Sequence, residues 1–179
     1  MQRLLAPVLL LLLACTTSRV AEVEPAREHL GFVFPPSVAG FDLQDYHEYE
    51  DPNLGVVANY RLPERTRLLV SAYVYPPPRL DDGSEQPIEA HARDELAGIL
   101  RYHEGGQQMS WLLELAYRSR SGRPTYQAAL EIRNAELGEI YSLLLVQDLG
   151  DARLKVRVSY PPSDTTAAFA IRRFLEEFL

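Results

Sequence analysis

Several segments of the chain after residue 40 alternate between apolar and polar residues with a period of two. The alternation is clearest in residues 56–62, where Val56, Ala58 and Tyr60 share one side. Because successive side chains of a strand point to opposite faces of a sheet, this pattern predicts a strand with one buried face. Similar patterns, or short apolar runs between turn residues, predict six more strands, at about 41–49, 68–75, 111–117, 126–132, 139–148 and 153–160.

Two segments have the apolar spacing of a helix instead. The first carries a stripe of five residues at spacings of four, four, three and four: Ile88, Ala92, Leu96, Ile99 and His103. The second closes the chain with a stripe of four: Ala167, Ile171, Phe174 and Phe178. The order is three strands, a helix, four strands and a helix, without the strand–helix–strand alternation of parallel sheets. We therefore expect an α+β fold: a single antiparallel sheet of about seven strands with both helices packed on one face.

The strand at 139–148 is apolar on both sides, so the second face of the sheet is too apolar for a solvated surface. Either the segment with Phe32 and Phe34 folds over that face, which we favour, or a partner protein covers it. If a partner does, arginine and lysine at one edge would border an interface. The candidate interface residues are Leu69, Tyr73, Tyr75, Leu112, Tyr141, Leu143, Leu145, Arg153, Lys155 and Arg157.

The beginning of the chain has the features of a secretory signal. Residues 4–14 form an apolar run behind Arg3, too short to span a membrane, which takes about 20 residues. An ordinary secretory cut after Ala14 would place the large Leu12 where a small residue is preferred, and the run has no amphipathic period typical of a buried helix. The segment Leu12-Leu13-Ala14-Cys15 resembles the lipobox of bacterial lipoproteins. The resemblance implies cleavage before Cys15 and a diacylglycerol on its sulfur.

This interpretation divides the chain into a signal peptide at 1–14, a lipid-anchored tether at 15–30 and one domain at 31–179. The membrane, reached through the lipid, is then the first partner. Thr16 stands where an Asp often accompanies retention at the inner membrane, so analogy favours the periplasmic side of the outer membrane. The choice between the two membranes stays open, and so does the identity of any envelope protein that serves as a partner.

The charge of the chain disfavours one class of function, and its composition limits its covalent chemistry. The chain has 18 basic and 25 acidic residues, a net charge of −7, which disfavours nucleic-acid binding. Cys15 is the only cysteine, so no disulfide can form within the chain. Only one basic residue is a lysine, Lys155.

The sequence contains no glycine-rich phosphate loop, no G-x-S-x-G turn and no H-E-x-x-H helix. His47 lies among carboxylates in "DYHEYED", but strand alternation splits that cluster between two faces. His91, with Asp94 and Glu95 on the same helix face, fits ordinary surface contacts. We therefore predict no catalytic residue, no metal site and no cofactor.

The order of elements, and the closing helix "FAIRRFLEEFL", resemble PsbP-like and DcrB-like domains. The resemblance implies a binding or accessory role, which gives the expected function: a non-enzymatic envelope lipoprotein held at the membrane. One alternative is a carrier of a lipid or other apolar ligand, which needs an enclosed apolar cavity of about 300 Å³ or more. The other is a hydrolase whose site assembles from distant residues, which needs a deep pocket with two or more converging titratable groups.

Overall fold

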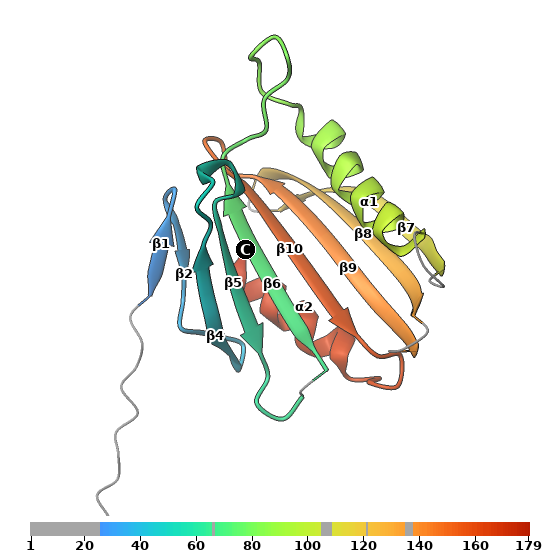
Figure 1. Ribbon diagram of the computed structural model, residues 1–179. Coiled ribbons are helices and arrows are strands. Elements are labelled where there is room, and N and C mark those ends of the chain that lie inside the picture. Colours follow the sequence, from blue (N-terminus) through green and yellow to red (C-terminus); the bar gives the residue numbers. More distant parts are fainter. Residues whose placement is uncertain (1–25, 66, 105–108, 121, 135–137) are drawn as a thin grey trace, which may run out of the picture.

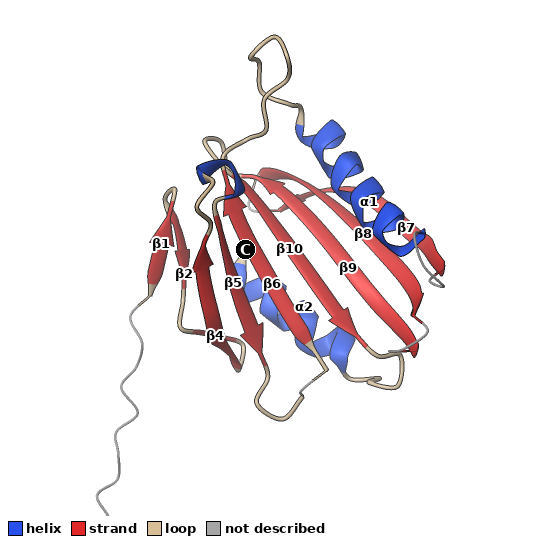
Figure 2. Ribbon diagram, in the orientation of Figure 1, coloured by secondary structure: helices blue, strands red, loops and turns tan. Residues whose placement is uncertain are grey.

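The computed structural model describes residues 26–65, 67–104, 109–120, 122–134 and 138–179, apart from the side chains of 102–104, 109–120 and 134. Figures 1 and 2 show a twisted sheet with two long helices. The elements are β1 (Arg27–His29), β2 (Phe32–Phe34), β3 (Ser37–Val38), β4 (Phe41–Glu48), the short 3-10 helix η1 (Pro52–Leu54), β5 (Val56–Arg61), β6 (Leu69–Tyr75), α1 (Ile88–Glu104), β7 (Met109–Arg120), β8 (Arg123–Asn134), β9 (Gly138–Asp148), β10 (Arg153–Tyr160) and α2 (Ala167–Phe178).

The sheet confirms the predicted α+β class and the order of elements. Its strands lie in the order β3-β4-β5-β6-β10-β9-β8-β7, and neighbouring strands pair antiparallel. The seven predicted strands are β4 to β10, and the two-residue β3 adds one at the edge. A separate hairpin of β1 and β2 begins at Arg27, inside the segment predicted as tether.

The prediction that both helices pack on one face is wrong: α1 and α2 lie on opposite faces of the sheet (Figure 1). Strand β9 shows why. Leu143 and Leu145 point toward α2, whereas Leu144 and Val146 point toward α1. Because β9 is apolar on both sides, the sequence predicted that something must cover the second face of the sheet. Helix α1 covers the β9 side chains on that face.

The larger core lies between α2 and the half of the sheet that begins at β4. Phe174 sits at its centre, with ring centroids 5.0 Å from Phe41 and 5.3 Å from Tyr60. Phe34 is fully buried in the same core, and the Phe32 ring lies 5.3 Å from that of Phe178. The expectation that Phe32 and Phe34 would cover the other face is therefore wrong, because they extend the α2 core.

Helix α1 covers the other half of the sheet on the opposite face. Its stripe of Ala92, Leu96 and Ile99 packs on β8 and β9, against side chains that include Leu130 and Leu144. Within the described residues, no helix is long and apolar enough to cross a membrane.

The central pairing of β6 with β10 decides which side chains meet on the α1 face. These strands lie far apart in the sequence, with α1 and three other strands between them, yet Tyr73 lies opposite Lys155 and Ser71 lies opposite Arg157. The pairing therefore places tyrosines beside cations in the middle of the sheet.

Candidate functional site

Because the two helices are offset, each leaves part of its own face of the sheet open. On the α1 side, the described helices do not cover β4, β5, β6 and β10, a region we call the open half-face (Figure 1). On the other side, a groove separates α2 from β8 and β9, which we call the α2 groove. These two regions are the candidate functional surfaces.

The ten candidate interface residues do not form one surface, because strand parity divides them. On the α1 side lie Leu69, Tyr73, Tyr75, Arg153, Lys155 and Arg157. On the α2 side lie Tyr141, Leu143 and Leu145, the last fully buried. The backbone of Leu112 lies in β7, where it pairs with Leu130, but its side chain is outside the described part of the structure. Cys15, the predicted lipidation site, lies wholly outside the described residues.

The open half-face meets the flank of α1 at four interacting side chains, Tyr75, His91, Glu95 and Lys155, which we call the Tyr75 cluster. The Tyr75 hydroxyl oxygen lies 2.9 Å from His91 Nε2 and 3.5 Å from Glu95 Oε1. His91 Nε2 lies 3.6 Å from the same carboxylate oxygen, and Lys155 Nζ lies 3.0 Å from Glu95 Oε2. The cluster thus joins β6 and β10 to α1.

Electrostatics fix the protonation state of two members. Burial raises the pKa of Glu95, but His91 and the charge of Lys155 together outweigh it and lower the pKa to about 2. Burial, reinforced by the Glu95 carboxylate, raises the pKa of Tyr75 well above its usual range. At neutral pH the Glu95 side chain is therefore ionised, and that of Tyr75 is a neutral phenol.

A shallow cavity of about 340 Å³ opens beside the cluster, with Tyr49, Leu54 and Pro78 among its walls. Tyr73 lines it too, and the Lys155 ammonium lies 4.5 Å from the Tyr73 ring centroid. That distance is typical of a cation–π contact. An aromatic wall around a fixed charge suits binding of a polar or charged group.

Sequence reasoning named Tyr75 and Lys155 as interface residues but missed their contacts with His91 and Glu95. His91 was interpreted as a surface residue, but only 4% of it is exposed, and Asp94 instead accepts a hydrogen bond from Gln86. The one usable signal was Lys155, the single lysine of the chain, in a strand whose other side is apolar. Its partner Glu95 stands 60 residues earlier, and single-sequence patterns carry no information about such distant pairs.

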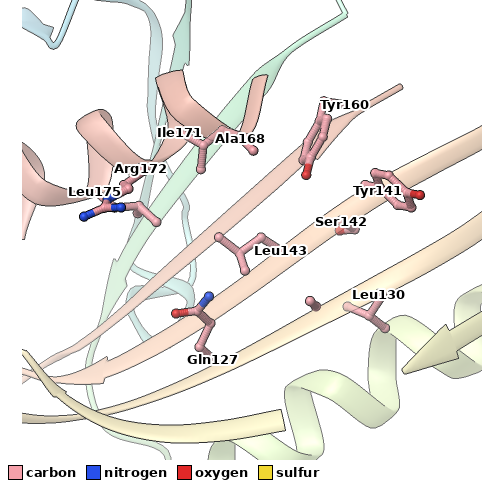
Figure 3. A pocket seen from close by; sticks show the side chains of 11 residues that line it. Gln127, Leu130, Tyr141, Ser142, Leu143, Tyr160, Ala168, Ile171, Arg172 and Leu175 are labelled. Carbon is pink, nitrogen blue, oxygen red and sulfur yellow. The ribbon is translucent and has the colours of Figure 1, made fainter. Parts of the chain in front are cut away.

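The α2 groove has a volume of about 420 Å³ and apolar walls, including Leu143, Ile171 and Leu175. Figure 3 shows Tyr141 and Tyr160 at one end of it and Gln127 at the other. The groove can bind an apolar chain. Elsewhere, within the described residues, no group of three or more His, Cys, Asp or Glu side chains could hold a metal ion.

No protein-family model and no curated protein sequence matches the chain. Among solved structures, it is similar to cyanobacterial PsbP (CyanoP) from Synechocystis sp. PCC 6803, with 14% identity, a TM-score of 0.53 and coverage of 79% of this chain and 81% of that one. It is also similar to PA94 from Pseudomonas aeruginosa, a protein of unknown function, with 10% identity, a TM-score of 0.43 and coverage of 87% and 94%. The first comparison shows that this chain has a PsbP-like fold.

Proposed function

We propose that the protein is a non-enzymatic, lipid-anchored module of the bacterial envelope that binds a partner protein through the open half-face. One observation carries the proposal: Tyr73, Lys155 and Arg157 stand half-buried, side by side, on a part of the sheet that the described helices leave uncovered. Tyrosine and arginine are enriched in protein interfaces, and they dominate the binding energy of many of them.

The Tyr75 cluster supports binding more than catalysis. It contains the converging titratable groups that a hydrolase would need, but these groups pair with one another, and only His91 Nδ1 is left without a hydrogen-bond partner among the described residues. Glu95 is held ionised between His91 and Lys155, and His91 contacts the phenol of Tyr75 instead of a serine, threonine or cysteine. An activated nucleophile needs a base within hydrogen-bond reach of a hydroxyl or thiol. The cluster is better suited to fixing the shape of the binding surface.

The proposed location follows from the lipobox-like segment that ends at Cys15. If Cys15 carries the lipid, residues 16–26 connect it to β1. Eleven residues extend to at most about 40 Å, so the domain would stay close to the membrane surface. Its binding partner would then be another component of the envelope, with the outer membrane favoured as the site of attachment.

Site-specific photo-cross-linking in intact cells tests the proposal. A benzophenone amino acid replaces Tyr73 on the open half-face or, as a control, Phe169, which is 69% exposed on α2. We expect one discrete cross-linked partner from position 73 and none from position 169. Equal capture at both positions, or no capture at position 73, would contradict the proposal.

A second function, a carrier of apolar ligands, is favoured by the volume of the α2 groove, about 420 Å³. This volume exceeds the roughly 300 Å³ expected of a carrier, but the groove is open and not the enclosed cavity that was expected. The test is binding of a fluorescent fatty acid to the wild type and to Leu143→Trp, which would fill the groove beside Ile171. Saturable binding that the substitution abolishes would support a carrier. Binding that Leu143→Trp leaves unchanged would place the fatty acid elsewhere.

A further inference from the structure

Arg157 differs from the other two cations of β10 in having no acceptor. Arg153 is buried and pairs with Asp148 at 2.6 Å, and Lys155 pairs with Glu95 at 3.0 Å. Among the described residues, the Arg157 side chain makes no hydrogen bond or ion pair. Its Nε atom is buried without a partner, as the Nε of Arg153 is, but the terminal nitrogens of Arg153 bond to Asp148 and Gln86, whereas those of Arg157 have no partner in the described part of the chain. The open half-face therefore contains one uncompensated guanidinium.

The neighbouring polar groups are engaged elsewhere. Ser71, directly across from Arg157, donates its hydroxyl hydrogen to Asn59 Oδ1 at 2.7 Å. Asn59 in turn donates to Asp45 Oδ2 at 3.3 Å, so this carboxylate is bound to the amide. Burial raises the pKa of Tyr73, and the nearby charge of Arg157 lowers it by a smaller amount. Tyr73 is therefore close to Arg157, but as a neutral phenol it is not an anion. The side chains around Arg157 thus offer it no anion.

An arginine donor that is buried without an acceptor destabilises the unbound protein, because it has lost water and gained nothing in return. A planar carboxylate can accept two parallel hydrogen bonds from one guanidinium edge. Such an anion would satisfy the buried Nε and one terminal nitrogen together. The missing component of the site is therefore an oxyanion.

We infer that Arg157 is the anion-binding residue of the open half-face, and that it binds a carboxylate of an acidic side chain on the partner protein. This rests on the proposed function and adds the chemistry of the partner. Because Asp148 neutralises Arg153 and Glu95 neutralises Lys155, Arg157 is the one cation of β10 without an anionic partner among the described residues, which matches a singly charged carboxylate. A phosphate dianion would bring excess negative charge toward Glu95.

Nuclear magnetic resonance of the Arg157 Nε–H group tests the anion site directly, with the protein purified as the full chain from cells. The probes are sodium acetate and inorganic phosphate, with sodium chloride at matched ionic strength as the blank. We expect acetate to shift the Arg157 resonance saturably, while that of Arg153, whose terminal nitrogens are already paired with Asp148 and the Gln86 carbonyl, stays fixed. Saturation by phosphate alone, or by neither anion, would overturn the inference.

Cross-linking from position 73 then tests the partner. We expect Arg157→Gln to reduce capture by roughly tenfold or more, about 1.4 kcal/mol of binding. Arg93→Gln, the matched control, removes the same charge from an exposed helix position paired with Glu89 and should change nothing. If Arg157→Gln does not fold by circular dichroism, Arg157→Lys replaces it and should also weaken capture, since lysine cannot bind both carboxylate oxygens in parallel.

These outcomes separate the two proposals. Capture that Arg157→Gln, or Arg157→Lys in its place, leaves unchanged would overturn the inference and leave the proposed function standing. Failure of the wild-type surface to capture any partner would overturn the proposed function, and the carboxylate partner with it. The acetate titration would then decide separately whether Arg157 binds an anion.

Discussion

The ammonium group of Lys155 lies 3.0 Å from Oε2 of Glu95, so an ion pair fastens α1 to the central strand β10. Both side chains are about three-quarters buried, at 21% and 26% exposure. Pairs of this kind are strongly destabilising to break, because the remaining charge stays desolvated. The pair also holds the Lys155 ammonium against the Tyr73 ring, which couples the stability of the fold to the shape of the open half-face.

The first prediction concerns pH. Since folding lowers the pKa of Glu95 to about 2, its ionised form stabilises the folded protein above the unfolded value of 4.5, and this contribution is lost as pH falls toward 2. A shift of that size corresponds to about 3 kcal/mol at most. We expect Glu95→Gln to lower the free energy of unfolding by about 2–3 kcal/mol at pH 7. The difference from wild type should shrink steadily below pH 4.5.

Urea unfolding at several pH values measures this difference. Glu176→Gln is the control, because Glu176 pairs with Arg172 on the exposed side of α2 and should contribute little at any pH. A Glu95→Gln deficit that stays constant between pH 7 and pH 3 would show that the lost contribution is not that of the ionised carboxylate.

The second prediction separates the two faces of the sheet. Leu143→Asp places a charge in the apolar groove against the α2 core and should destabilise the domain by about 3 kcal/mol or more. Tyr73→Asp should cost less, because Lys155 and Arg157 stand on the same side of the sheet and can pair with the new carboxylate. Thermal unfolding by circular dichroism compares the two variants. Equal destabilisation by both would mean that Tyr73 contributes to a core.

The strands could be predicted from the sequence because alternation directly reports which faces are buried. Residues 153–160 alternate Leu154, Val156 and Val158 with cations, and these three are fully buried in β10. The same patterns do not report which helix covers which face. Only the two-sided burial of β9 carried that information, and it fits a helix on the second face as well as it fits a partner.

The site could not be predicted because it depends on pairings between distant segments. Tyr75 meets His91 across a loop, and Glu95 of α1 meets Lys155 of β10, which stands 60 residues later in the chain. Sequence patterns placed Lys155 and Arg157 on one strand face, and the structure confirms that placement. The same patterns do not show that Lys155 has an anionic partner, Glu95, whereas Arg157 has none among the described residues.

The third prediction concerns the anchor. Replacing Cys15 by Ser removes the sulfur that would carry the diacylglycerol, so lipidation should stop, leaving an uncut or soluble form. Mass spectrometry of the protein from a membrane fraction measures this. In the wild type it should find a modified Cys15 as the first residue. An unmodified N-terminus at any other residue would contradict the lipoprotein interpretation.

The fourth prediction is a stabilising change in α1. Gly98 lies inside the helix, and a Cβ atom added there would meet no atom within 4 Å. Alanine is favoured over glycine in a helix by about 1 kcal/mol, partly because glycine loses more backbone freedom on folding. Gly98→Ala should therefore raise the melting temperature by about 2–4 °C. A decrease would mean that the space above Gly98 is occupied.

The last prediction is the opposite outcome at Gly55, in the turn between β4 and β5. Its φ angle is +62°, and an added Cβ would lie 2.0 Å from the Val74 carbonyl oxygen and 2.7 Å from the Tyr75 Cα. Both neighbouring atoms belong to the β6 backbone, so no side-chain rotation can relieve the clash. Gly55→Ala should destabilise the domain by about 3 kcal/mol, from backbone strain and overpacking together. Because the displaced backbone carries Tyr75, the variant should also disturb the Tyr75 cluster, seen as a changed chemical shift of the His91 ring. A variant as stable as wild type, with an unchanged His91 signal, would show that the β4–β5 turn does not approach β6 this closely.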